Sequence, residues 1–449
     1  MDNDFLAIAN SLKRSMKYLG PWTAGDLSFG LRALTDAHLK REIQDPPEGD
    51  VINDKQLIKT WVREVEVADA VYEESTEAIS KACSLEPGNV VSFRATSDHL
   101  QPAYCLAKSV QHRQILLVVR GTKNFYDALT NLAGAYEAVE GGFAHHGMLK
   151  SAEWLLEQEG DRIRSLLDDH PGYGLRLIGH SLGGGTSSLL CWLLHNMPPD
   201  VPDWKPHLSS ISCIAFACPP VLTSHLARSC TDHTTSIISQ HDAVPRTSLA
   251  SLEELRKEIL ATKWPDQLRD QVLGKKLGAL AQASFASIAE HYDRATRSLN
   301  KLLEDPAISS HHKAMTSAVQ GAWSRISEEA SKGRVVSEQL VKSLQERFAR
   351  DSKGQLGKPH AESRDLSQLQ HRQDMPSLED PPQLHAPGRI IFLAAASEGK
   401  KGSGVQLIKA LPRGFDRIIL NKSMLSDHLC QSYKEQLQSL LDEQPSEQQ

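Results

Sequence analysis

The sequence feature that most constrains the fold is a Gly-x-Ser-x-Gly pentapeptide, residues 179–183, with Ser181 at its centre. The apolar run at residues 175–178 before it is typical of a buried strand, and residues 186–197 after it are typical of a helix. A strand that turns at once into a helix holds the central serine in a strained backbone conformation and needs small flanking residues. The pattern therefore predicts a nucleophile elbow that presents the Ser181 hydroxyl, and the context favours this over a chance match in a glycine-rich turn.

Strand-like and helix-like runs alternate around the elbow. Strands are predicted at residues 90–93, 103–107, 115–119, 211–216, 235–239, 389–393 and 417–420. Helices are predicted at residues 148–167 and, after a cap at Asn53-Asp54, over residues 55–72. This alternation predicts an α/β fold with a mostly parallel sheet and helices on both faces, in which catalytic groups meet at the carboxyl ends of the strands.

Composition shifts divide the chain into five regions. We predict an N-terminal helical arm packed on the core (1–89), a first part of the α/β core (90–255), a helical insert (256–350), a polar and disordered linker (351–387), and a second part of the core with a C-terminal helix (388–449). The amphipathic spacing of the insert is compatible with a lid or interfacial surface and equally with a packing appendage.

Charge and cysteine content narrow the function classes. The 449 residues carry a net charge of −6, so no basic surplus indicates a nucleic-acid partner. The seven cysteines are scattered without a Cys-x-x-Cys pair, which favours a reducing compartment, and we expect neither a metal site nor a cofactor. The first residues are not those of a signal peptide, and no window approaches the ~18 apolar residues of a transmembrane helix. We therefore expect a cytoplasmic protein that reaches any lipid substrate by transient peripheral association with a membrane.

A reactive serine needs a base and an acid that orients the base, and in this kind of fold the chain order is serine, acid, histidine. Asp242 follows the strand at 235–239 and is the predicted acid; Asp232 is the rival but precedes that strand. The histidines downstream are His291, His311, His312, His360, His371, His385 and His428. His428 alone follows an ordered strand and is the predicted base, whereas His241 beside the acid is interpreted as structural.

Two backbone donors are expected to stabilise the oxyanion. One is the N–H of Leu182, directly after the nucleophile, and the other comes from the loop after the buried strand at 115–119, where Gly121 and Thr122 lie. The backbone N–H and the hydroxyl of Thr122 are both able to donate.

Six motifs in order carry a family resemblance. They are Arg120-Gly121-Thr122, residues 127–132, His146-Gly147-Met148, residues 179–183, residues 242–246 and residues 424–428. Together they resemble the class 3, fungal-type lipases and, among these, the sn-1-specific diacylglycerol lipases and their plant and algal relatives. The resemblance covers about residues 90–255 and 388–440.

The resemblance implies an α/β-hydrolase fold, a Ser181–Asp242–His428 triad, an oxyanion hole from Thr122 and Leu182, and hydrolysis of acylglycerol esters at a membrane or droplet surface. The sequence departs from the family at Asn131, where an aspartate is usual, and at the bulky residues 123–126. It also lacks the transmembrane helices of the animal diacylglycerol lipases. Two alternatives remain: an esterase or phospholipase acting on other acyl esters, and a non-catalytic lipid-binding or scaffold relative.

Overall fold

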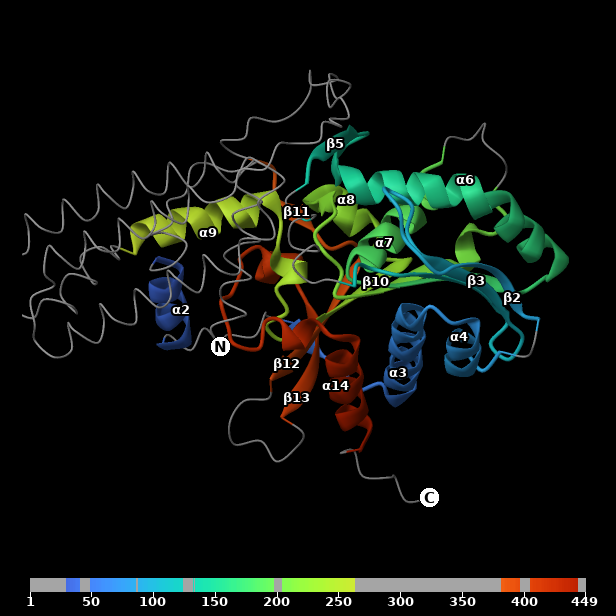
Figure 1. The fold of residues 1–449 in the computed structure, drawn as a ribbon, viewed down its shortest axis with the longest axis horizontal. Coiled ribbons are helices and arrows are strands. Elements are labelled where there is room, and N and C mark those ends of the chain that lie inside the picture. Colours follow the sequence, from blue (N-terminus) through green and yellow to red (C-terminus); the bar gives the residue numbers. More distant parts are fainter. Residues whose placement is uncertain are drawn as a thin grey trace, which may run out of the picture. The chain divides into compact units, whose positions relative to one another are not determined.

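The computed structural model describes residues 30–40, 49–85, 88–123, 132, 134–197, 204–262, 381–395 and 404–442, all of which belong to one compact unit. Its centre is a nine-stranded sheet in the order β1-β13-β12-β10-β8-β7-β4-β3-β2 (Figure 1). The strands are β1 (Gly49–Val51), β2 (Val90–Arg94), β3 (Tyr104–Ser109), β4 (Gln114–Val119), β7 (Gly174–His180), β8 (Ile211–Phe216), β10 (Thr234–Ser239), β12 (Arg389–Ala395) and β13 (Val405–Ala410).

The middle of this sheet is parallel and its margins are antiparallel. Strands β4, β7, β8, β10 and β12 pair in parallel, whereas β2 and β3 on one side and β13 and β1 on the other pair antiparallel. The predicted strands at 115–119, 175–178, 211–216, 235–239 and 389–393 all lie in the parallel part. The predicted α/β-hydrolase architecture, with a mostly parallel sheet, is therefore confirmed.

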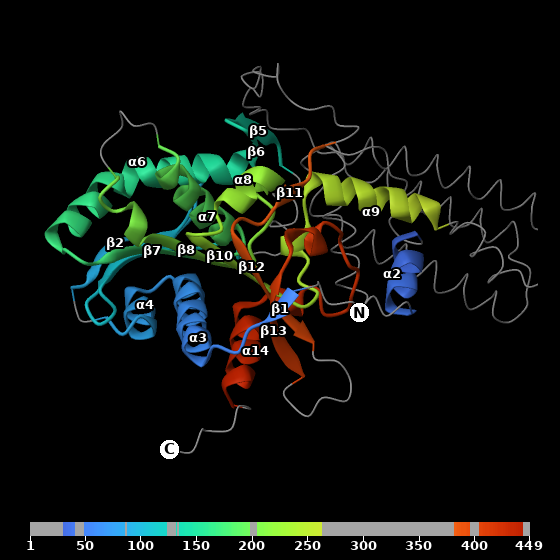
Figure 2. The same ribbon diagram turned by 180° about the vertical axis from the view of Figure 1, so that it is seen from behind.

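Helices cover both faces of the sheet. The first face carries α6 (His146–Asp169), α7 (Leu182–His195) and α8 (Ser224–Ser229), and the second carries α3 (Lys55–Ala70), α4 (Thr76–Ala82) and α14 (Cys430–Asp442) (Figures 1 and 2). Two further helices are α2 (Leu31–Lys40) and α9 (Leu249–Ala261), and short 3-10 helices are η2 (Val71–Glu73), η3 (Leu208–Ser210), η4 (Val244–Arg246), η6 (Pro412–Phe415) and η7 (Ser426–His428).

The helices take these places because of their apolar faces. Helix α3 begins at the predicted cap, where the Asp54 side chain accepts a hydrogen bond from the Leu57 N–H at 2.9 Å. Its buried residues Ile58, Trp61 and Val65 recur at helical spacing and pack against the second face of the sheet. Helix α7 is buried over almost its whole length because it packs against α6, β7 and β8, and its carboxyl-terminal residue His195 is half-buried.

One of the predicted strands, at residues 417–420 in the C-terminal part of the chain, is absent from the structure. Residues 417–420 are not a strand; the strand that pairs with β12 is β13, and Pro412 follows its end. Ile418 and Leu420 are nevertheless buried, because the loop that holds them packs inward and the Leu420 N–H donates to Nδ1 of His38 on α2. A loop whose side chains are buried therefore has the same run of apolar residues as a buried strand.

Two of the predicted regions contain strands that the sequence did not predict. The N-terminal arm contributes a strand, β1, as well as helices, and the predicted linker contains β11 (Leu384–His385), in which Leu384 is buried. This strand joins β5 (Tyr136–Val139), β6 (Gly142–His145) and β9 (Leu222–Thr223) in a second sheet, ordered β11-β9-β6-β5. The predicted insert beyond residue 262, the linker up to residue 380 and the departures at 124–126 and at Asn131 lie outside the described residues.

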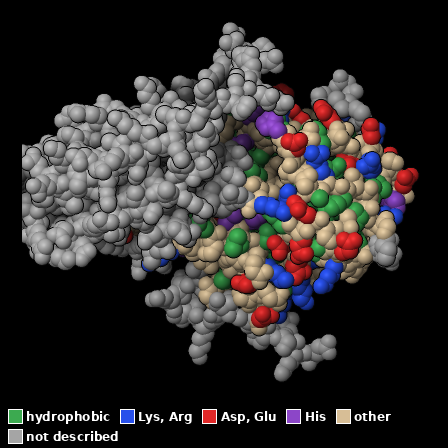
Figure 3. All heavy atoms as spheres, in the orientation of Figure 1, with side chains coloured by type: hydrophobic (Ala, Val, Ile, Leu, Met, Phe, Trp, Pro, Cys, Tyr) green, Lys and Arg blue, Asp and Glu red, His purple; other side chains and the backbone are tan. Residues whose placement is uncertain are grey.

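The face of the described unit in Figure 3 has Lys and Arg side chains interspersed with Asp and Glu side chains, and hydrophobic atoms lie between them. No helix within the described ranges combines the length and the apolar character needed to cross a bilayer.

Candidate active site

Ser181 lies in the turn between β7 and α7 with φ 59° and ψ −131°, a conformation that side-chain-bearing residues rarely adopt. The turn is tight enough that a Cβ at Gly183 would come within 2.2 Å of the Val119 carbonyl oxygen at the end of β4. Only glycine fits there, since any side chain would collide with backbone. The Gly-x-Ser-x-Gly pattern thus folds into the predicted elbow, at the carboxyl end of the parallel strands.

The structure brings Ser181, Asp242 and His428 together, although 247 positions separate the serine from the histidine. His428 Nε2 lies 3.0 Å from Ser181 Oγ, and Nδ1 of the same ring lies 3.0 and 3.1 Å from the two carboxylate oxygens of Asp242. All three residues are buried, with Ser181 1%, Asp242 0% and His428 6% exposed. A hydroxyl, an imidazole and a carboxylate in this order can move a proton from the serine to the ring.

Two further donors orient the Asp242 carboxylate. The Val244 N–H donates to Oδ1 at 2.9 Å, and the Tyr433 hydroxyl on α14 donates to Oδ2 at 2.7 Å. Burial, and then the charge of Asp242, raises the pKa of the Tyr433 phenol, so this group remains a donor at every physiological pH. The carboxylate is thus oriented by α14 as well as by its own loop.

The predicted oxyanion loop passes directly beside the nucleophile. A Cβ on Gly121 would lie 3.0 Å from the Ser181 Cβ and 2.7 Å from the His180 carbonyl oxygen, so only glycine allows this approach. Leu182 is the first residue of α7, where backbone N–H groups have no partner within the helix. Thr122 follows Gly121 in the loop and is half-buried.

The N-terminal arm supports this loop, a role that no pattern in the sequence indicated. The Arg120 guanidinium binds the Glu74 carboxylate at 2.7 Å and the Ala95 carbonyl oxygen at 2.8 Å, and Lys123 binds the same Glu74 at 2.9 Å. Hydrogen bonds from Lys123 and then Arg120 lower the pKa of Glu74. The loop is therefore tied on both sides of Gly121 to the residue that follows η2.

Tyr72 and His180 were also missed, and they connect this loop to the base. The Tyr72 hydroxyl lies 3.0 Å from His180 Nδ1 and has a hydrogen bond with the Gly121 backbone, while His180 Nε2 lies 2.7 Å from the His428 carbonyl oxygen. Burial, and then His428, lowers the pKa of His180 to about 3, so its ring is neutral. With the proton on Nε2, the ring donates to the His428 carbonyl and accepts from Tyr72. In the sequence Tyr72 continues the apolar spacing of the helix predicted over residues 55–72. Its hydroxyl is the only feature that sets it apart from the other apolar positions of that helix.

The rival residues lie elsewhere. Asp232 is exposed in the turn before β10, and His385 lies 3.1 Å from the Asp416 carboxylate. His241 contacts Asp427 and Ser423, in agreement with its structural interpretation. The remaining candidate histidines, at 291, 311, 312, 360 and 371, lie outside the described residues.

Residues 116–252, which contain most of β4, the elbow and Asp242, match the family model described as lipase (class 3). This part of the α/β core is similar to the class 3 lipases. The chain is 33% identical over 162 residues to human diacylglycerol lipase-alpha, and 32% identical over 162 residues to mouse diacylglycerol lipase-beta. These matches cover 33% and 34% of this chain and 15% and 23% of those proteins, so the chain matches less than a quarter of either relative.

The chain is also similar to microbial lipases. A lipase of Rhizopus niveus is 33% identical over 95 residues, which cover 20% of this chain and 24% of that protein. The solved lipase of Rhizopus microsporus var. chinensis superposes with a TM-score of 0.39 at 21% identity, over 46% of this chain and 75% of that one.

Proposed function

We propose that this protein is a serine hydrolase that cleaves ester bonds of acylglycerols, and that diacylglycerol, cut at sn-1, is its substrate. The observation that carries the proposal is the unbroken hydrogen-bond series from Ser181 Oγ through His428 to Asp242, at 3.0 and 3.0 Å, on a serine held at positive φ. The similarity to diacylglycerol lipases supports the choice of substrate.

In the proposed reaction the Ser181 oxygen attacks the ester carbonyl carbon while His428 Nε2 accepts the hydroxyl proton. The imidazolium is stabilised by Asp242, which Val244 and Tyr433 hold in place by hydrogen bonds. The carbonyl oxygen becomes negative and accepts hydrogen bonds from the Leu182 N–H and from Thr122. His428 then gives its proton to the leaving glycerol oxygen, which leaves an acyl ester on Ser181.

A water molecule completes the cycle. His428 Nε2 takes a proton from the water, the resulting hydroxide attacks the acyl carbon, and the fatty acid leaves as the proton returns to Ser181 Oγ. The protein would meet its substrate at a membrane or droplet surface through transient peripheral association, because acylglycerols are not dispersed in water.

Labelling with a fluorophosphonate tests the first part of the proposal, because this reagent reacts only with an activated serine. We expect the full-length protein to be labelled and the Ser181→Ala variant to be unlabelled, with a loss of turnover of about 10⁴–10⁶. Absence of labelling in the folded wild-type protein contradicts a hydrolase and supports the non-catalytic alternative.

A substrate panel tests the second part. Diacylglycerols with different acyl chains at sn-1 and sn-2 are presented in vesicles beside triacylglycerol, monoacylglycerol and phosphatidylcholine. We expect the sn-1 fatty acid of diacylglycerol to be released fastest. Faster release from phosphatidylcholine, with labelling of Ser181 intact, supports the phospholipase alternative and overturns the choice of substrate alone.

A further inference from the structure

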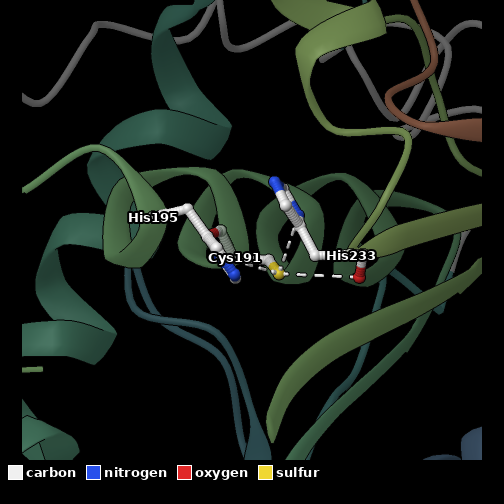
Figure 4. A group of neighbouring side chains, drawn as sticks. All are labelled: Cys191, His195 and His233. Atoms are coloured by element: carbon white, nitrogen blue, oxygen red, sulfur yellow. Dashed lines mark hydrogen bonds between the residues drawn. The ribbon is translucent and has the colours of Figure 1, made fainter. Parts of the chain in front are cut away.

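Three metal-ligating side chains meet at the end of the sheet opposite the active site. Cys191 and His195 lie four residues apart on the last turns of α7, and His233 directly precedes β10 (Figure 4). Each offers a ligand atom, and these atoms all lie within 4.8 Å of one another. Ser181 is at the other end of α7, ten residues from Cys191, which places the cluster about 15 Å or more from the nucleophile.

The distances between the ligand atoms suit one small ion. Cys191 Sγ lies 3.4 Å from His233 Nδ1 and 3.9 Å from His195 Nδ1. A tetrahedral zinc ion bound by a thiolate at ~2.3 Å and an imidazole at ~2.0 Å separates the sulfur and the nitrogen by about 3.5 Å. The two observed separations lie on either side of this value. The cluster therefore has the spacing of ligands that share an ion.

The cluster is also accessible from solvent on the side of the two histidines. Cys191 is fully buried, whereas both histidines are half-buried, which gives an ion a route from solvent to the thiol. The Asp232 carboxylate beside His233 adds negative charge at this entrance.

We propose that Cys191, His195 and His233 bind a divalent ion of the zinc class, with a water molecule in the fourth position. A thiol with two imidazoles selects zinc and its neighbours over magnesium or calcium, which prefer oxygen ligands. On binding, each imidazole contributes a nitrogen lone pair, and the Cys191 thiol loses its proton to solvent and binds as thiolate. The ion would join the end of α7 to the start of β10.

Binding must also rearrange the two rings. The imidazoles of His195 and His233 stack at 3.8 Å with an angle of 11°, and parallel rings do not direct two lone pairs at one point. Nδ1 of His195 moreover lies 2.9 Å from the Cys191 carbonyl oxygen. The His195 ring therefore has to turn out of the stack and carry its proton on Nε2 when the ion binds. This rotation is a local change at the last turn of α7.

Cobalt titration of the purified full-length protein, after removal of metal with a chelator, tests the site. Co²⁺ replaces Zn²⁺ in tetrahedral sites, and a thiolate ligand gives an intense near-ultraviolet charge-transfer absorption. We expect this absorption to saturate at one equivalent and to be displaced by zinc. We also expect zinc to raise the midpoint of thermal unfolding. The absence of charge-transfer absorption in the wild-type protein overturns the proposal without any variant.

Variants assign the ligands. We expect Cys191→Ser to abolish the charge-transfer absorption, and His195→Gln and His233→Gln each to weaken zinc binding at least tenfold. Cys83→Ser, at a buried thiol on the other face of the sheet, and His99→Gln, at an exposed histidine, serve as matched controls that leave binding unchanged. An absorption that persists in Cys191→Ser, or that the controls remove equally, contradicts the assignment. The readouts are independent of ester hydrolysis, so the outcome does not depend on the proposed function.

Discussion

Ser181 has a backbone conformation that is unfavourable for serine, at a position where the reaction requires its hydroxyl. Its φ of 59° and ψ of −131° lie in a region that glycine enters freely and that costs other residues about 1–3 kcal/mol. The strain persists because the end of β7, the start of α7 and the loop after β4 pack closely around the turn. The protein thus carries an unfavourable residue at the one position where its hydroxyl meets His428.

Replacement of Ser181 separates the two effects. Ser181→Gly and Ser181→Ala both remove the hydroxyl, and we expect both to be inactive. We expect the glycine variant to be more stable than the alanine variant by about 1 kcal/mol, because relief of strain exceeds the greater entropy of glycine in the unfolded chain. Urea unfolding of the two variants measures the difference. If the alanine variant is the more stable one, as it is at ordinary positions, the turn stores no strain.

Tyr72 shows how a residue outside the reacting groups can position them. We expect Tyr72→Phe to lower kcat about tenfold with little change in KM, because His180 loses its donor and holds the His428 carbonyl less firmly. Steady-state kinetics on a soluble ester measures both constants. Tyr173→Phe, at a tyrosine on the turn before β7, is the matched control.

A role in stability alone gives a different result for Tyr72. In that case Tyr72→Phe would lower the free energy of unfolding and leave kcat unchanged once the folded fraction is taken into account. If Tyr72 positions the base, the pH dependence of kcat should also change in Tyr72→Phe and not in the control. The reason is that the hydrogen bonds from Tyr72 through His180 end on His428, which transfers the proton.

Among the elements, α3 is tied to the strand that carries the elbow by a buried ion pair. Glu64 on α3 is 0% exposed, and its two carboxylate oxygens accept hydrogen bonds from Arg176 on β7 at 2.7 and 2.9 Å. Arg176 also donates to Ser212 on the neighbouring strand β8. A bidentate pair in a buried position fixes how α3 lies across the sheet.

Removal of one partner should cost far more than removal of both. We expect Glu64→Leu to lower the free energy of unfolding by about 3–5 kcal/mol, because the Arg176 charge stays buried without its partner. We expect the double variant Glu64→Leu/Arg176→Leu to recover at least half of this loss. Denaturant unfolding of the two single variants and the double variant gives the coupling energy. Additive losses would mean that the two residues do not act as a pair.

The elements that the sequence predicted are those whose pattern reflects a local cause. The elbow was predictable because small residues and a strand–helix change are both required by the same turn, and Asp242 because it follows the parallel strand β10. His428 was predicted from the chain order serine, acid, histidine, although the strand expected before it is a loop. Residues 417–420 were mispredicted because tertiary packing, with His38 as partner of the Leu420 N–H, buries them in a loop. The contribution of Tyr72 depends on a contact with His180, 108 positions away, and no local pattern encodes such a contact.

At the scale of the whole molecule, three separated parts of the chain converge on one site. The N-terminal arm supplies Tyr72 and Glu74, the first core segment supplies Ser181 and Asp242, and the second core segment supplies His428 and Tyr433. Strands β10 and β12 pair in parallel although the whole of residues 240–388 separates them, and this pairing joins the core segment that holds the acid to the one that holds the base. The site is therefore a product of the complete sheet and not of any one segment.

His180 lies where these parts meet, and it links the stability of the molecule to pH. It is 5% exposed, and its pKa is lowered from 6.5 to about 3, first by burial. Between pH 6.5 and 3 the unfolded chain therefore binds a proton at this residue that the folded protein does not. The free energy of unfolding must then fall as the pH falls, by about 1.4 kcal/mol per pH unit from this residue, or about 2 kcal/mol at pH 5.

The glutamine variant isolates this contribution from that of every other titrating group. His180→Gln cannot take up a proton, so we expect its unfolding free energy to decline less steeply than that of the wild type below pH 6.5. The two curves should approach each other by about 2 kcal/mol between pH 7.5 and 5. His99→Gln, at an exposed histidine, should run parallel to the wild type. If the curve of His180→Gln also runs parallel to that of the wild type, the folded protein accepts a proton at this position. The neutral ring that donates to the His428 carbonyl would then not be the form present at mildly acidic pH.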